Sequence, residues 1–139
     1  MRLAAPILAG TALGVLFAAL SLCYEPGRPF FEFAEFVFIG TAIYAGPGAL
    51  VLSVPHSLWM LKLCSRGMSL PRRCLLGATA GIPLGLLNLI AAMLVYDRGF
   101  RLIVLDGRTL WLVTAGIAGG VGLGLGCAWG TVRGRKAPP

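Results

Sequence analysis

Four long apolar runs, joined by short polar segments, make up most of the chain. The runs cover Leu3–Tyr24, Phe33–Leu61, Leu75–Tyr96 and Thr109–Thr131. Each contains at least the ~20 residues that an α-helix needs to cross about 30 Å of hydrocarbon. Backbone polar groups in lipid have to be satisfied within their own segment, so we expect all four runs to be helices. The pattern predicts an all-α membrane protein, a bundle of four transmembrane helices.

The composition agrees with a membrane protein of one domain. Of the 139 residues, 58% are hydrophobic and 12% are charged, whereas a soluble domain normally carries about 25% charged residues. The polar segments between the runs are too short to build a separate hydrophobic core. We therefore expect residues 1–139 to form a single integral membrane domain. Its expected partner is the lipid bilayer in which it is embedded.

Lysine and arginine are unevenly distributed between the two predicted sides of the membrane. One side would hold both termini, the basic loop 62–74 and the basic tail 132–139, with eight cations: Arg2, Lys62, Arg66, Arg72, Arg73, Arg133, Arg135 and Lys136. The other side would hold four: Arg28, Arg98, Arg101 and Arg108. Because loops on the cytoplasmic side carry the excess of positive charge, both termini are predicted to be cytoplasmic.

The same charged residues indicate which membrane holds the protein and whether it binds nucleic acid. Arginine strongly outnumbers lysine, as in chains from GC-rich bacterial genomes, and this favours the bacterial inner membrane. The net charge of +7 lies at the ends of apolar runs and forms no patch interleaved with aromatic residues, so we expect no nucleic-acid binding. The first run has a second interpretation as a secretory signal, with a weak cleavage site near Ala19 and Ser21.

The stretch GIAGGVGLGLG at residues 116–126 has six glycines in eleven residues. A phosphate-binding loop needs the spacing G-x-G-x-x-G or G-x-x-x-x-G-K-[ST]. Neither spacing occurs. Cys127 and Leu125 stand where the third glycine of the first motif would have to be, and no Lys-Ser or Lys-Thr follows for the second motif. The stretch is therefore predicted to be membrane helix rather than a nucleotide site.

At a spacing of four residues the glycines form ordered rows of the GxxxG type. Two rows on the fourth run, offset by two residues, would lie on roughly opposite sides of one helix. Bare helix faces let neighbouring backbones approach closely and are typical of association in lipid. The rows are a glycine zipper that could pack within one chain, against a second copy or against another membrane protein. The predicted helix-packing residues are Gly10, Gly14, Gly77, Gly81, Gly85, Gly116, Gly120, Gly124, Gly122, Gly126 and Gly130.

Three residues define a possible intramembrane polar site, namely Pro47, His56 and Asn88. Pro47 removes a helical hydrogen bond and lies between two glycines, a pattern that transporters use at mid-membrane. Polar residues at membrane depth are functional candidates by default. Each also has a structural interpretation, in which Pro47 only kinks its helix, Asn88 bonds across to another helix, and His56 bonds Ser53 or a nearby carbonyl. At helical rise, His56 and Asn88 would differ by about 10 Å in depth, too far for a hydrogen bond.

Acidic residues and one arginine on the other side of the membrane form a candidate contact face for a soluble partner. These residues are Glu25, Glu32, Glu35 and Arg101. Asp106-Gly107 within 101–112 is a possible hairpin signal, although the pattern of 109–112 also predicts helix.

Cys64, Cys74 and Cys127 lie near the level of His56, but their spacing matches no metal-binding pattern. No metal, no cofactor and no structural disulfide is therefore predicted.

The sequence favours a protein without enzymatic activity. The lone histidine has no acid within helical reach, and no paired carboxylates share a pocket. The preferred hypothesis is a small membrane protein that acts by helix–helix association, either as an accessory or assembly subunit or as an immunity-type protein. The alternatives are a small oligomeric transporter or channel using the kinked second helix, and an intramembrane enzyme or redox carrier using His56 and the cysteines.

Overall fold

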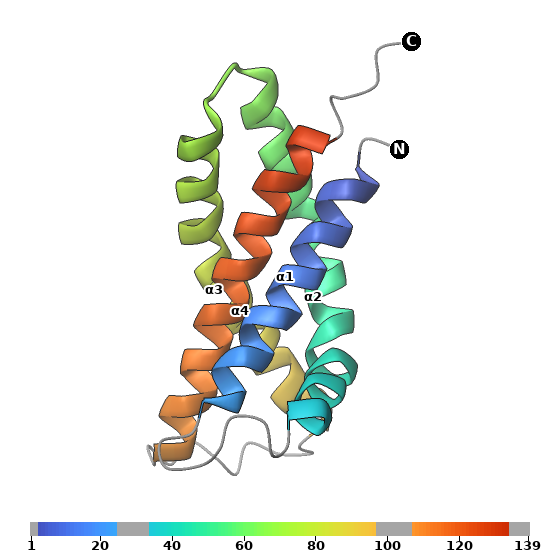
Figure 1. The fold of residues 1–139 in the computed structure, drawn as a ribbon, viewed down its shortest axis with the longest axis vertical. Helices are drawn as coiled ribbons and strands as arrows, with labels where there is room; N and C mark the ends of the chain where they lie inside the picture. The colour runs from blue at the N-terminus through green and yellow to red at the C-terminus, as the bar shows by residue number, and fades with distance from the viewer. Residues whose placement is uncertain (1–2, 25–33, 97–106, 134–139) are drawn as a thin grey trace.

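The computed structural model describes residues 3–24, 34–96 and 107–133, and almost all of these residues are helical. Figure 1 shows the helices lying alongside one another as a bundle. The helices are α1 (Ala4–Cys23), α2 (Ala34–Ser65), α3 (Leu70–Tyr96) and α4 (Gly107–Arg133). Each is long and apolar enough to cross a membrane. The chain is a multi-pass membrane protein with an all-helical fold.

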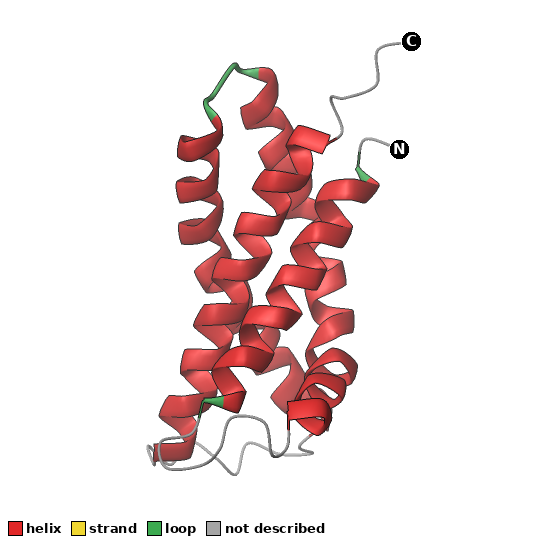
Figure 2. Ribbon diagram, viewed as in Figure 1, coloured by secondary structure: helices red, strands yellow, loops and turns green. Residues whose placement is uncertain are grey.

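The bundle has two distinct ends. At one end, called here the turn end, α2 turns directly into α3, α1 begins and α4 ends (Figure 1). At the opposite end, called the far end, α1 and α3 finish and α2 and α4 begin (Figure 1). Figure 2 shows that non-helical backbone within the described segments is confined to short stretches at helix ends. The helices run alternately up and down, as short connections between neighbours require.

The turn between α2 and α3 is shorter than predicted. The prediction of a loop over 62–74 was wrong in extent. Only residues 66–69 lie between the two helices. Gly67 has φ +77°, the left-handed conformation in which a Schellman motif closes a helix. The closing bonds run from the Gly67 N–H to the Cys64 carbonyl at 3.1 Å and from the Met68 N–H to the Leu63 carbonyl at 3.4 Å. Pro71 does not interrupt α3 because it lies in the first turn, where a missing N–H costs nothing.

The hairpin suggested for 101–112 is also wrong in its second half. Helix α4 begins at Gly107, so residues 107–112 are helix rather than strand. The first half of the suggested hairpin lies outside the described residues. A strand at 107–112 would leave unpaired backbone groups next to the bilayer, whereas a helix satisfies them within the segment.

Helix α4 is the centre of the bundle. It packs extensively against α1 on one side and against α3 on the other. Helix α2 closes the remaining side through less extensive contacts with the other three helices. The buried apolar core includes Ala49 and Met60 of α2 with Leu123 and Cys127 of α4. Outward faces are apolar as well, for example Val51 and Leu75, which are 68% and 67% exposed. A large apolar exterior marks contact with a membrane or another protein, in agreement with four helices long and apolar enough to span a membrane.

Candidate functional site

One glycine row of α4 lies against the glycine row of α3. A Cβ atom placed on Gly77 would lie 2.6 Å from the Gly124 carbonyl oxygen, and one on Gly85 would lie 2.6 Å from the Gly120 Cα. Real Cβ atoms do not approach other atoms so closely, so a side chain here would push the helices apart. The facing residues are Gly116, Gly120 and Gly124 of α4 with Gly85, Gly81 and Gly77 of α3.

The second row of α4 lies against α1. A Cβ on Gly126 would lie 2.7 Å from the Gly10 Cα, and a Cβ on Gly130 would lie 2.7 Å from the Pro6 nitrogen. In return, a Cβ on Gly14 would lie 3.2 Å from the Gly119 carbonyl oxygen. The structure therefore places helices of this same chain on both rows. A second copy or another protein could not use them without displacing α1 or α3.

A pocket of about 460 Å³ lies in the half of the bundle toward the far end. All four helices contribute to its lining, which is formed almost entirely by apolar side chains and glycines. Lining residues include Ala18 of α1, Gly40 and Tyr44 of α2, Met93 of α3, and Trp111 and Ala115 of α4. The pocket exists because the bundle is filled by small residues at this level, and small residues leave space where larger ones would interdigitate.

Asn88 supplies one polar group of the pocket, whose lining also includes Thr41 and Tyr44. Its side-chain Nδ2 donates a hydrogen bond of 3.0 Å to the Ala45 carbonyl of α2. This bond confirms the expectation that Asn88 bonds across to another helix. The amide lies directly over Gly48, where a Cβ would be 3.0 Å from the Asn88 Cγ. Gly48, the residue after Pro47 in α2, thus makes room for the Asn88 amide.

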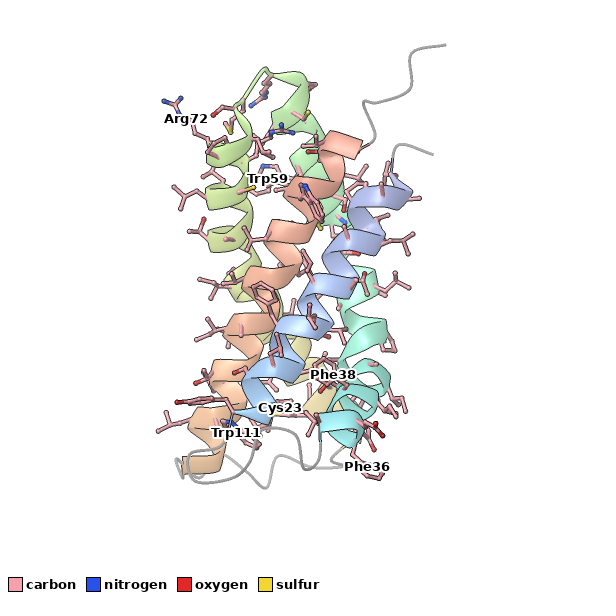
Figure 3. The ribbon with its side chains drawn as sticks, in the orientation of Figure 1. Cys23, Phe36, Phe38, Trp59, Arg72 and Trp111 are labelled. Carbon is pink, nitrogen blue, oxygen red and sulfur yellow. The ribbon has the colours of Figure 1, made fainter. Side chains whose placement is uncertain are left out.

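Trp111 supplies a second polar group. It lines the pocket, and its Nε1 atom is buried without a hydrogen-bond partner within the described part of the chain. Figure 3 shows Trp111 at the far end, the opposite end from Trp59 and Arg72. An indole N–H is a donor only, so this position is suited to an oxygen acceptor on a bound molecule. No sequence motif marked Trp111 as a binding residue.

His56 lies elsewhere, near the turn end. The ring is 5% exposed, lies against the backbone of Gly77 of α3, and stacks obliquely with Trp59 at 5.5 Å between centroids. Ser53 donates to the Leu50 carbonyl at 2.7 Å, and the polar contact of His56 is with the Gly77 backbone, in agreement with the alternative expectation of a nearby carbonyl. The prediction that His56 and Asn88 do not meet is confirmed, because eleven residues of α3 separate their contact points.

Arg73 is a buried charge that the sequence reasoning counted only as a marker of topology. It is 6% exposed, and its Nη1 donates a 2.6 Å hydrogen bond to the Thr131 hydroxyl of α4. That hydroxyl in turn donates to the Ala128 carbonyl at 2.6 Å. A heptad-like or four-residue pattern could have placed Arg73 on the face of Gly77, since the two are one turn apart.

The predicted contact face on the far side is described only in part. Glu35 lies in the first turn of α2 and is exposed. Glu25, Glu32 and Arg101 lie outside the described residues, as does any pairing among them. The four cysteines are free thiols, and the described residues contain no group of three potential metal ligands.

No known protein family matches the chain, and no curated protein or solved structure is significantly similar to it.

Proposed function

We propose that this protein is a non-enzymatic membrane protein that binds the hydrocarbon chain of a lipid between its four helices. The pocket carries this proposal. Its volume of about 460 Å³ lies within the roughly 300–1,000 Å³ that ligand sites occupy. A mostly apolar lining with a few polar groups is also typical of such sites.

The chemistry of the surroundings favours a lipid chain as the occupant. Phe36 and Tyr44 line the pocket and are 77% and 54% exposed, so its rim reaches the outer faces of the bundle, which contact hydrocarbon in a membrane. The lining extends from Trp111 to Leu123, about 18 Å at helical rise, which suits an extended chain. The Trp111 N–H would donate to the carboxyl or ester oxygen at the head of that chain.

Two glycines of α2 offer a matched test. Gly40 lines the pocket, whereas Gly46 is not among its lining residues, and a Cβ at either position would meet nothing within 4 Å. Gly40→Phe should therefore fill the pocket without a clash at its Cβ, and Gly46→Phe should add the same ring outside it. Binding of a pyrene-labelled fatty acid to the purified protein in detergent, followed by energy transfer from tryptophan, reports occupancy.

The expected result is that Gly40→Phe weakens binding about tenfold or more, since it removes apolar burial from the ligand, while Gly46→Phe leaves it nearly unchanged. Equal binding by both variants would contradict the proposal. Solute or proton flux in proteoliposomes that is lost in His56→Ala would instead favour the transporter function.

Association with another membrane protein is a second candidate, as an accessory or assembly subunit or an immunity-type protein. One observation favours it: Gly46 is a bare position between Ile43 and Leu50, two residues of α2 that are 58% and 45% exposed. A small residue on an outward face permits close approach of another helix. The test is cross-linking from Gly46→Cys in native membranes, which should capture a discrete product if this face is an interface.

We further propose that the protein lies in a bacterial inner membrane with both termini in the cytoplasm. The unequal distribution of lysine and arginine supports this orientation. Among the described residues, the basic residues at the turn end are Lys62, Arg66, Arg72, Arg73 and Arg133, whereas Glu35 and Arg108 lie at the far end. Activity of a cytoplasmic reporter fused after residue 139 would support the orientation, and activity of a periplasmic reporter would reverse it.

A further inference from the structure

Two buried polar side chains near the turn end have unused hydrogen-bonding atoms. The Nε2 of His56 and the Nε of Arg73 are both buried and have no hydrogen-bond partner among the residues that the structure describes. Both residues are more than nine-tenths buried, at 5% and 6% exposure. Buried polar atoms are nearly always paired, so two unpaired atoms in one region indicate a missing partner.

The two side chains belong to one junction of three helices. His56 of α2 lies against the backbone of Gly77 of α3. Arg73 lies one turn before Gly77, on the same face of α3, where residues four apart are about 5–6 Å from each other. A Cβ on Gly77 would lie 3.4 Å from the Ala128 Cβ of α4, and Arg73 bonds Thr131 three residues further along α4. Helices α2, α3 and α4 therefore meet where His56 and Arg73 lie.

The charge of Arg73 has no counterpart in the described part of the chain. The acid present there is Glu35, which lies in the first turn of α2, about 30 Å along that helix from His56 at helical rise. The Thr131 hydroxyl satisfies one guanidinium N–H but carries no charge. Burying a cation without an opposite charge is strongly unfavourable, and intramembrane cations are normally paired. An anion would supply both the missing opposite charge and an acceptor for the unused N–H.

We propose that Arg73 and His56 bind a phosphate group that enters the bundle at its turn end. A planar guanidinium matches the geometry of phosphate oxygens, and a histidine beside it adds a second donor. The approach to this end is lined by further cations, Lys62, Arg66 and Arg72, which are exposed. Figure 3 shows Arg72 extending away from the bundle, so it can attract the anion without holding it. The phosphate belongs either to a phospholipid headgroup or to free phosphate from solution.

Arg72 and Arg73 provide a matched pair of variants. Arg72→Gln and Arg73→Gln remove the same charge from adjacent positions, one exposed and one buried. The full chain is purified in a non-ionic detergent and stripped of lipid. Thermal unfolding is then followed with added inorganic phosphate, with chloride at equal ionic strength, with dioleoyl phosphatidylglycerol, or with a galactolipid that has the same chains and no phosphate.

Stabilisation by inorganic phosphate that persists in Arg72→Gln and is lost in Arg73→Gln supports a site for free phosphate. Stabilisation by the phospholipid alone, with the same dependence on Arg73, supports a headgroup site. In either case His56→Gln should weaken the apparent affinity about tenfold. If Arg73→Gln does not fold, Arg73→Lys replaces it, and the apparent affinity should fall because a lysine cannot bind bidentately. Equal responses to phosphate-containing and phosphate-free additives, or equal losses in Arg72→Gln and Arg73→Gln, would overturn the proposal.

Discussion

Replacing Gly120 by alanine tests the arrangement of α3 and α4 directly. A Cβ at Gly120 would lie 2.8 Å from the Gly81 carbonyl carbon and 3.0 Å from the Ile82 Cα. Carbon atoms in favourable contact are about 3.5–4.0 Å apart, so α3 would have to withdraw by roughly half an ångström or more. Both obstructing atoms belong to the backbone of a packed helix, and no rotation of a side chain can relieve the contact.

The change in the free energy of unfolding caused by Gly120→Ala is the sum of two opposing effects. Alanine in a helix is more favourable than glycine by up to about 1 kcal/mol, while overpacking in a well-packed interior costs about 1–3 kcal/mol. Gly46→Ala supplies the first term alone, because its Cβ would meet nothing within 4 Å. The difference between Gly120→Ala and Gly46→Ala is therefore the overpacking cost, and we expect Gly120→Ala to be less stable by about 1–3 kcal/mol.

Reversible unfolding in mixed micelles, monitored by circular dichroism, measures both variants under identical conditions. Gly46→Ala should unfold at the same or a higher denaturant fraction than the original protein, and Gly120→Ala at a lower one. If Gly120→Ala were as stable as Gly46→Ala, α3 and α4 could not lie in the close contact that the structure shows.

Three further predictions concern the turn, the pocket and the thiols. Gly67→Ala should lower the free energy of unfolding by about 1–2 kcal/mol, because alanine is unfavourable in the left-handed conformation; an unchanged value in the same unfolding assay would exclude the Schellman turn. Asn88→Leu should lower it by about 0.5–2 kcal/mol through loss of the bond to the Ala45 carbonyl, and a more stable variant would contradict that bond. In the folded protein a maleimide should modify the half-buried Cys74 much faster than the buried Cys127, and equal rates would show that the α1–α4 contact opens.

Much of the fold could be predicted from hydropathy because a membrane imposes length and composition on each helix. All four runs are helices, although α2 extends past Leu61 and α3 begins before Leu75. Those errors occurred where polar and basic residues continue a helix beyond the hydrocarbon. Hydropathy has no information about that extension, whereas the positive φ of Gly67 locates the turn.

The candidate sites were harder to predict from the sequence than the helices. Glycine spacing predicted two bare faces of α4 but not which helices would cover them, since Gly120 and Gly126 could equally have met another chain. The pocket depends on how four helices come together around Gly40 and Trp111, and no local pattern encodes that. Arg73 resembled any other loop cation until its helix assignment placed it one turn from Gly77.

The measurement closest to the central claim is photo-cross-linking with a fatty acid that carries a diazirine near the end of its chain. The protein is labelled in detergent, and the modified residues are identified by peptide mass spectrometry. If a lipid chain occupies the pocket, label should concentrate on lining residues such as Ala92, Met93 and Ala115, and an excess of unlabelled fatty acid should remove it. Label spread over outward residues such as Val51 and Leu75, without competition, would contradict a lipid site inside the bundle.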